Sequence, residues 1–524
     1  MWEWVNEEAD ECVSLEHHMG IYKPARAINA QAEPSFYVWG DGITDQTGTF
    51  HKVDEYGVVK LEKKKYFLPA WSTLNLSGKN PEKEFKQQRR FSCEIPFPEG
   101  EKPTMAEYLE KYLKVHGKNG HIGFLFLLGS LCFDIFKDQA DSYPVAFFKG
   151  IPNSGKGTMA KSLGAFFGGA DMLNLEKSNT MASINAHVSQ AASAMAFFNE
   201  FNYTNITSSF PAFIKYIKAA WDMEGRKRIR DITTNQTEEV EMDSIMVLLG
   251  QEDVPERSVM QRVVIAEFLS NVYTAEQNEN YLNLRELEGK GLTHLTNQLL
   301  GHRTLIAERL KDAVTWTNSK LKEKVEVMAD QRFFSNWSSL LAPMFILLKE
   351  GKIDYPMTIS GWLDFAVERI EHQVKAMKEE GLAAIFFEFL MHEFSANKPR
   401  IDDRAVYVEG NQMRVQFNQV YGHFDAYLQR TGKSKSLENT GKKYLKEDLM
   451  NHVAFIEEKK KNCNIGFKRN SQGMLVYDNN GQPVHNRTSG LIFNYEELKA
   501  KGLEIQQSDF GNITTNSQPQ SVTI

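Results

Sequence analysis

Residues 150–158 read Gly-Ile-Pro-Asn-Ser-Gly-Lys-Gly-Thr, and this stretch decides the fold of the chain. It follows the apolar run Pro-Val-Ala-Phe-Phe at 144–148 and precedes a segment of helical periodicity that starts near Thr158. A strand, a glycine loop and a helix in this order place backbone N–H groups and a helix N-terminus around phosphate groups. The stretch therefore predicts that the chain binds and hydrolyses a nucleoside triphosphate, ATP, together with Mg²⁺.

The loop supplies the groups expected to hold the phosphates. Its glycines permit a tight turn and a close approach of the backbone, and Lys156 is the only side chain there that reaches the β- and γ-phosphate oxygens as a point charge. The usual pattern has Ser or Thr directly after the Lys to hold Mg²⁺. Gly157 stands at that position, so either Thr158 or a water molecule is expected to provide this contact. The residues expected to bind the nucleotide are Gly150, Asn153, Ser154, Gly155, Lys156, Gly157 and Thr158.

A second constellation follows the apolar run Ala-Met-Ala-Phe-Phe at 194–198, which leads into Asn199 and Glu200. An acid at the carboxyl end of a strand next to the loop strand is where an ATPase places the group that orients the attacking water. We expect Glu200 to be the catalytic base and, with Thr158, a candidate Mg²⁺ contact. The alternative is an exposed Glu at a strand end.

A third constellation lies at 248–268, where Gln251 closes an apolar strand and two arginines precede the next one. Gln251 is expected to contact the γ-phosphate. Arg262, with Arg257 as second choice, is expected to reach the nucleotide of a neighbouring subunit. The alternative is that both are surface arginines in solvent-exposed pairs.

Composition limits the classes of protein that the chain belongs to. Its 524 residues, of which 42% are hydrophobic, predict several globular domains, and the net charge of −7 means that contacts with nucleic acid must come from local patches. The four cysteines lie far apart, which argues against a zinc knuckle and a disulfide framework. The longest apolar run, 122–133, is too short for a membrane span, so we expect a cytoplasmic protein with no membrane association.

The pattern along the chain predicts an α/β fold in six parts. The core is expected to be a parallel sheet with helices on both faces, because apolar strands alternate with helical segments. Strand-like and helical patterns flank it. The predicted parts are an N-terminal β-rich module (1–100), a helical collar (101–142), the nucleotide-binding core (143–270), a helical lid or connector (271–380), a winged-helix-like domain (381–506) and a disordered tail (507–524).

The ordered set GIPNSGKGT, AMAFFNEF and LLGQEDVPERSVMQRVVIAEF resembles the compact P-loop AAA+ core of superfamily 3 helicases from phages, plasmids and mobile elements, including the motor domain of poxvirus and phage primase-helicases. The resemblance covers residues 143–268 and departs from the family at Gly157 and Asn199, which leaves the Mg²⁺ ligands open. It implies a ring-shaped homo-oligomer, most simply a hexamer. The family roles fall on Asn153, Lys156, Thr158, Glu200, Gln251 and Arg262.

Two basic stretches are candidates for contact with nucleic acid. The first comprises Arg226, Lys227, Arg228 and Arg230, after which 232–236 and 239–242 are expected to fold back as a hairpin. In superfamily 3 helicases a hairpin at this position enters the central channel and holds the phosphates of the strand. Single-stranded DNA is therefore the expected partner, and a solvated charge run is the alternative.

The second basic stretch lies in the winged-helix-like part, where residues 425–469 contain eleven Lys/Arg and six Asp/Glu. The cations expected near the recognition helix are Arg430, Lys433, Lys435, Lys442, Lys443 and Lys446. A basic helix with a basic approach loop is consistent with contact to duplex DNA, and equally with a solvated helix face.

Three functions fit these patterns. The first is an ATP-hydrolysing motor on single-stranded nucleic acid, a replicative DNA helicase of a mobile element or phage. The second is an ATP-dependent DNA-binding switch or initiator that does not unwind. The third is a nucleotide kinase, which the 149 residues before Gly150 disfavour. Because no zinc motif or other primase signature is present in the sequence, a primase activity is expected in a separate partner chain.

Overall fold

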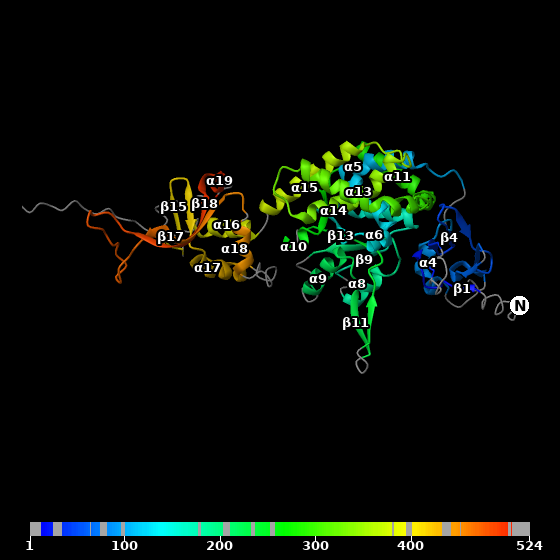
Figure 1. The fold of residues 1–524 in the computed structure, drawn as a ribbon, viewed down its shortest axis with the longest axis horizontal. Helices are drawn as coiled ribbons and strands as arrows, with labels where there is room; N and C mark the ends of the chain where they lie inside the picture. The colour runs from blue at the N-terminus through cyan, green and yellow to red at the C-terminus, as the bar shows by residue number, and fades with distance from the viewer. Residues whose placement is uncertain are drawn as a thin grey trace, which may run out of the picture. The chain divides into compact units, whose positions relative to one another are not determined.

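A computed structural model of the chain describes residues 12–24, 34–62, 64–73, 81–95, 100–176, 180–202, 210–231, 236–251, 257–379, 382–394, 401–431, 442–450, 452–500, 503 and 505. The chain divides into two compact units (Figure 1). The first combines Met1–Val254 with Ser258–Glu371, and the second combines Pro255–Arg257 with His372–Ile524.

A five-stranded parallel sheet forms the centre of the first unit. Its strands, in spatial order, are β14 (Val263–Phe268), β8 (Val145–Gly150), β13 (Ile245–Gly250), β10 (Met195–Phe201) and β9 (Met172–Asn174). All four neighbouring pairs are parallel. Every residue of β13 is buried, as expected for a strand covered on both faces. The predicted α/β fold is confirmed, and the apolar patch at 172–175 provides the edge strand of the sheet.

One expectation about the sheet was wrong. Glu200 lies on β10, which was expected next to the loop strand β8, but β13 lies between them. After β8 the chain crosses to β9 at the sheet edge, pairs β10 with it, and only then inserts β13 beside β8. Local sequence patterns carry no information about this order, because each strand has the same apolar character.

The register of the sheet brings four strand ends to one edge. Gly150 is opposite Phe268, Lys149 is opposite Gly250, and Gly250 is opposite Phe201. In parallel sheets ligands bind in the crevice beyond the carboxyl ends of the strands, where the strand order reverses. β8 lies at such a point. After β8 the chain forms β9, β10 and β13 on one side of this strand, and it then places β14 on the other side.

Helices cover both faces of the sheet, with α5, α13 and α14 on one side and α8 and α9 on the other (Figure 1). The collar begins at Thr104, whose hydroxyl accepts from the Glu107 amide while the Glu107 carboxylate accepts from the Thr104 amide. This capping box fixes the first turn of α5. The helices are α5 (Met105–Ser130), α6 (Phe133–Gln139), α7 (Lys156–Gly164), α8 (Met181–Val188), α9 (Phe210–Trp221), α10 (Arg257–Met260), α11 (Ala275–Gly289), α12 (Thr293–Leu300), α13 (Arg303–Lys324), α14 (Gln331–Lys349) and α15 (Ile359–Glu379).

No single helix in these ranges combines the length and the apolar character of a membrane span. Helices α5 and α6 meet the criterion only as a pair, which is bent by 70°.

The N-terminal strands form two small sheets rather than one meander. The first contains β2 (Gly20–Tyr22), β3 (Phe36–Trp39), β4 (Gly42–Thr44) and β5 (Phe50–Lys52), and the second contains β1 (Cys12–Ser14), β7 (Lys64–Phe67) and β6 (Val58–Leu61). Short helices α3 (Pro81–Glu84) and α4 (Lys86–Arg90) follow. The buried carboxylate of Asp41 accepts from the amides of Cys93, Glu94 and Ile95, which ties the first sheet to the segment leading to the collar.

The basic run before β13 forms a hairpin, with a different start from the one expected. Its strands are β11 (Arg226–Asp231) and β12 (Gln236–Val240), so Arg226, Lys227, Arg228 and Arg230 lie within the first strand instead of before it. In the backbone register Lys227 is opposite Glu239 and Arg228 is opposite Glu238. Figure 1 shows β11 reaching away from the parallel sheet, beyond α8 and α9. The expected hairpin residues 232–235 lie outside the described part.

The elements of the second unit alternate helices with strand pairs, and a winged helix stays a prediction for this part. It contains α16 (Leu382–Phe394), β15 (Val406–Glu409), β16 (Gln412–Val415), α17 (Phe417–Arg430), α18 (Lys442–Met450), β17 (Phe455–Phe467), β18 (His485–Asn494) and α19 (Tyr495–Ala500). The sheet order is β15-β16-β18-β17, so the strand before the helix pair joins the hairpin after it. One apolar core holds these elements together, with Phe386, Phe389 and Phe424 in mutual ring contact. The β15–β16 hairpin was not predicted.

We predict opposite effects on stability for alanine at two glycines of the loop. A Cβ atom at Gly150 would lie 2.1 Å from the carbonyl oxygen of Phe268, whereas one at Gly157 meets nothing within 4 Å. Gly150→Ala should therefore lower the free energy of unfolding of the first unit by about 1–3 kcal/mol. Gly157→Ala lies in α7 and should raise it by about 0.5–1 kcal/mol. Denaturant unfolding without nucleotide measures both, and equal effects would contradict the tight approach of β8 to β14.

Candidate nucleotide site

A cavity of about 700 Å³ lies at the carboxyl edge of the parallel sheet. Its walls are the loop before α7, the ends of β10, β13 and β14, one side of α5 and the beginning of α11. The predicted residues that line it are Asn153, Ser154, Gly155, Lys156, Gly157, Thr158, Glu200 and Gln251. Three separate sequence motifs therefore meet in one cavity. Gly150 is not part of the lining, but its carbonyl group lies directly beneath it as a partner of Lys156.

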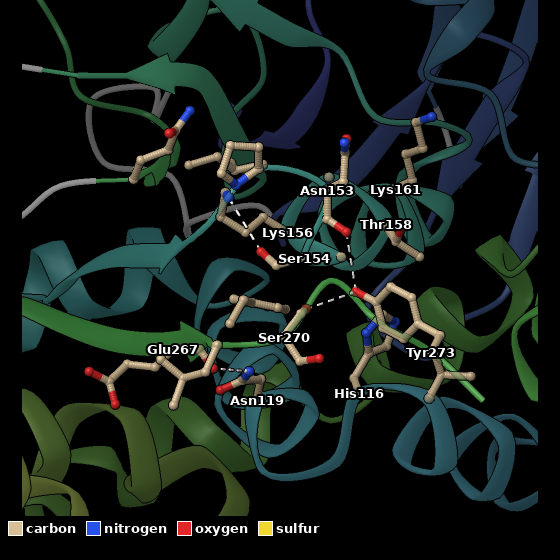
Figure 2. Close-up of a pocket in the computed structure, with 18 of the residues that line it drawn as sticks. His116, Asn119, Asn153, Ser154, Lys156, Thr158, Lys161, Glu267, Ser270 and Tyr273 are labelled. Atoms are coloured by element: carbon tan, nitrogen blue, oxygen red, sulfur yellow. Dashed lines mark hydrogen bonds between the residues drawn. The ribbon is translucent and has the colours of Figure 1, made fainter. Parts of the chain in front are cut away.

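Oxygen atoms of the loop surround the ammonium group of Lys156, and Figure 2 shows its contact with Ser154. Its Nζ atom donates to the carbonyl oxygens of Gly150 and Ile151 at 2.6 and 2.7 Å, and lies 3.4 Å from Ser154 Oγ. Two residues reverse the chain here, Asn153 with φ 60° and Gly155 with φ 94°. Burial lowers the pKa of Lys156, and the carboxylate of Glu200 acts in the opposite direction. The cation is therefore held inside a turn by backbone oxygens, with an acid within electrostatic range.

The first turn of α7 is open to an anion. Gly155 precedes the helix and no side chain caps its first amide groups. Helix N-termini bind phosphate through such uncapped N–H groups and through the positive end of the helix dipole. Because Gly157 has no side chain and open space around it, phosphate oxygens can approach the backbone there.

Glu200 has an unusual backbone conformation at the end of β10. Its φ is 56°, and the pairing of β10 with β13 shifts register between Phe198 and Phe201. A residue with a Cβ atom rarely adopts positive φ, and such conformations concentrate at functional sites. The irregularity turns the half-buried Glu200 into the cavity instead of continuing the strand alternation. Gln251 follows the last residue of β13 and is exposed at the same edge.

Sequence reasoning missed the wall formed by α5 and by the segment after β14. Asn119 Nδ2 donates to the carbonyl oxygen of Glu267 at 2.7 Å, and His116 Nε2 lies 3.2 Å from Ser162 Oγ on α7. The Tyr273 hydroxyl donates to the carbonyl oxygen of Asn153 at 3.4 Å (Figure 2). Gly117 has non-helical dihedral angles inside α5, and this glycine was the one local signal of a special site there.

Arg262 does not line the cavity. It precedes β14, and its carbonyl oxygen accepts from the amide of Val145 at the amino end of β8, so it lies at the opposite end of the sheet. Its guanidinium lies 5.0 Å from the ring centre of Trp221 and donates to the carbonyl oxygen of Ser258 at 2.8 Å. Trp221 in turn donates to Asn336 on α14. Arg257 begins α10, and its side chain lies outside the described part of the structure.

No three His, Cys, Asp or Glu side chains converge as a metal site within the described ranges. In the cavity, Thr158 and Glu200 are the residues expected to contact Mg²⁺, and both line it. Mg²⁺ in nucleotide sites takes one or two protein oxygens and completes its shell with phosphates and water. This pair of oxygen donors fits that requirement.

The basic residues expected to bind nucleic acid differ in their surroundings. Arg226, Lys227, Arg228 and Arg230 lie on β11, and their side chains are outside the described part. On the predicted recognition helix, Lys443 pairs with Glu447 at 3.8 Å and Lys446 pairs with Glu458 at 2.6 Å. Lys442 lies over the ring of Tyr421. Arg430 pairs with Glu393, and Lys433 and Lys435 lie outside the described residues. The excess of cations at 425–469 is thus partly neutralised within the fold.

No family model and no curated protein matches the chain. Among solved structures, an active helicase, Cch of SCCmec type IV, aligns with 12% identity and a TM-score of 0.47, covering 85% of this chain and 80% of that one. The X-ray structure of JCV helicase aligns with 16% identity and a TM-score of 0.28, covering 53% of this chain and 83% of that one. At these identities and TM-scores the likenesses do not establish a shared activity.

We predict that the stability of the fold depends on pH because His116 is buried in the wall of the cavity. Burial lowers the pKa of His116 to about 3. As pH falls below about 6.5, the unfolded chain takes up a proton at this residue and the native chain does not. Stability should therefore fall by up to about 1.4 kcal/mol per pH unit from this one group. His116→Gln keeps a hydrogen-bonding group near Ser162 and should flatten the slope between pH 6 and pH 4 in denaturant titrations; an unchanged slope would exclude a buried neutral His116.

Proposed function

We propose that the chain is an ATP-hydrolysing motor that moves along single-stranded nucleic acid, as the replicative DNA helicase of a mobile element or phage. The observation that carries this proposal is the convergence of Lys156, Glu200 and Gln251 on one cavity at the N-terminus of α7. Their motif order resembles that of superfamily 3 helicases, which supports a motor over other ATPases.

Each residue of the cavity has a distinct task in the proposed reaction. Lys156 and the amides of the first turn of α7 hold the β- and γ-phosphates of ATP. Glu200 accepts a proton from the attacking water, and Gln251 contacts the γ-phosphate from the neighbouring strand end. Thr158 and Glu200 would hold Mg²⁺, which would supply positive charge against the phosphate oxygens. The remaining wall, formed by α5 and Tyr273, leaves room for the base of the nucleotide.

The contacts of Lys156 are consistent with this task. The carbonyl oxygens of Gly150 and Ile151 hold its ammonium group, so the loop is already wrapped around it. A bound phosphate would provide the countercharge that these neutral groups lack. A preformed loop lowers the ordering cost of binding.

Arg262 belongs to the site of a neighbouring copy in this proposal. Because it lies at the amino end of β14, it cannot reach the phosphates of its own chain at the carboxyl end. A head-to-tail ring, most simply a hexamer, would bring this end of one subunit to the cavity of the next. The indole of Trp221 and the carbonyl of Ser258 keep the guanidinium oriented.

The β11–β12 hairpin is the proposed contact with the strand inside the ring. It carries four cations at 226–230 and reaches away from the sheet that binds nucleotide. Cations along a projecting hairpin track a phosphate backbone without sequence preference. The protein is expected in the cytoplasm, with any primase on a separate partner chain.

A second function is supported by the winged-helix-like pattern predicted for the C-terminal unit. An ATP-dependent switch or initiator would use this unit to bind a duplex site and would assemble on ATP without unwinding. Strand separation distinguishes the two functions.

We predict that two substitutions in the cavity separate binding from hydrolysis. Lys156→Ala removes the phosphate cation and should weaken ATP binding and abolish turnover. Glu200→Gln keeps the shape but not the base, so ATP binding should persist while kcat falls by about 10²–10⁴. Turnover and unwinding of a forked DNA are measured together. If the wild type unwinds the fork and both variants do not, the result supports the motor. If single strands stimulate ATP turnover of the wild type but the strands stay paired, the result supports the switch and contradicts the helicase.

We predict that Arg262 acts in trans. Arg262→Ala should bind ATP normally and lose turnover by about 10³ or more, as for other arginine fingers. Arg262→Ala mixed with Lys156→Ala should regain part of the activity, because a Lys156→Ala subunit supplies its intact arginine to the intact cavity of its neighbour. Arg332→Ala, at a second arginine near the same indole, is a control for disruption of the Trp221 cluster. Wild-type ATP turnover by Arg262→Ala would contradict the proposed role of Arg262 as an arginine finger.

A further inference from the structure

The β17–β18 ribbon of the C-terminal unit presents two large apolar side chains to solvent at its outer end. Met474 is 56% exposed and Tyr477 is 55% exposed, in a segment where most residues are polar. Figure 1 shows this ribbon running out beyond α16, α17 and α18. Neither residue belongs to the apolar core of the unit.

The end of the ribbon is a fixed structure. Three backbone hydrogen bonds connect its segments. The amide of Lys468 donates to the carbonyl oxygen of Val484 at 2.8 Å. The amide of Val476 donates to the carbonyl oxygen of Lys468 at 3.0 Å, and that of Val484 to the carbonyl oxygen of Val476 at 2.8 Å. These bonds make a small three-stranded tip with Met474 and Tyr477 on its middle segment. The side chains of Asn470 and Asp478 each accept from two backbone amides and hold the two turns. A tip held in this way presents its exposed ring at low conformational cost.

The ribbon that carries Tyr477 also carries cations that form no ion pair with the described residues. Within the described residues, four exposed cations on the ribbon and its tip have no ion pair, in contrast to Lys443, Lys446 and Lys459, which each face a glutamate. These four are Lys460, Lys461, Lys468 and Arg487. Within the described part of the unit, the ribbon and its tip therefore carry positive charge that is not neutralised by ion pairs. This distribution favours a polyanion as the partner over a second apolar surface.

We propose that the ribbon binds DNA at a junction of duplex and single strand, with Tyr477 stacked on the first unpaired base and Met474 beside it. The ribbon cations contact the flanking phosphates. Aromatic rings stack on any base without sequence preference, and apolar side chains inserted at a base step separate it from its neighbour. DNA binding here is independent of the nucleotide cavity, whereas a contribution to unwinding rests on the proposed function.

The test uses the full-length chain without ATP, so that failure of the ATPase proposal does not affect it. The probe is a forked DNA with 2-aminopurine as the first unpaired base, and its affinity and fluorescence are recorded with Tyr477→Ala and Tyr477→Phe. Loss of one stacking contact should weaken binding by roughly 5- to 150-fold and abolish the fluorescence change. Tyr477→Phe keeps the ring and should behave as the wild type.

A charge variant and a duplex probe complete the test. Replacing Lys460, Lys461 and Lys468 together by Gln should reduce the slope of log affinity against log salt by up to about 3. Blunt duplex without an unpaired base should bind Tyr477→Ala and the wild type equally. If Tyr477→Ala binds the fork with the affinity and the fluorescence change of the wild type, the proposal is overturned. The tip would then be a surface for docking another protein.

Discussion

The register of the parallel sheet is the constraint on which the candidate site depends. Gly150, Gly250, Phe201 and Phe268 end at the same level, so residues that follow three different strands meet in one cavity. The close approach of β8 to β14 at Gly150 leaves no room for a side chain and holds the loop against the sheet. A slip of one strand would move Glu200 or Gln251 away from Lys156 and dismantle the site.

The same sheet separates two sets of functional candidates. The cavity lies at its carboxyl edge, while Arg262 is fixed to Trp221 at its amino edge. This polarity is what a head-to-tail assembly requires, because each copy offers a cavity at one end and an arginine at the other. The proposed contacts with nucleic acid lie on two further features, the β11–β12 hairpin and the tip of the β17–β18 ribbon.

Sequence patterns predicted the strand, the loop and the helix around residues 145–164, because phosphate binding needs a specific loop with a strand before it and a helix after it. They did not predict that β13 separates β10 from β8, since strand order depends on crossovers between elements of similar composition. The positive φ of Glu200 and the wall formed by His116 and Asn119 arise from tertiary packing. The count of lysines and arginines at 425–469 overstated the free positive charge of the predicted recognition helix. Glu447 and Glu458 form ion pairs with cations of this helix in the folded chain.

The most direct measurement of the central claim is single-particle imaging of the full-length chain with a non-hydrolysable ATP analogue and Mg²⁺. The account predicts a closed ring, most simply six-fold, with the triphosphate on residues 150–158 and Arg262 of the adjacent copy at the γ-phosphate. A monomer, or a nucleotide bound away from Lys156, would contradict it.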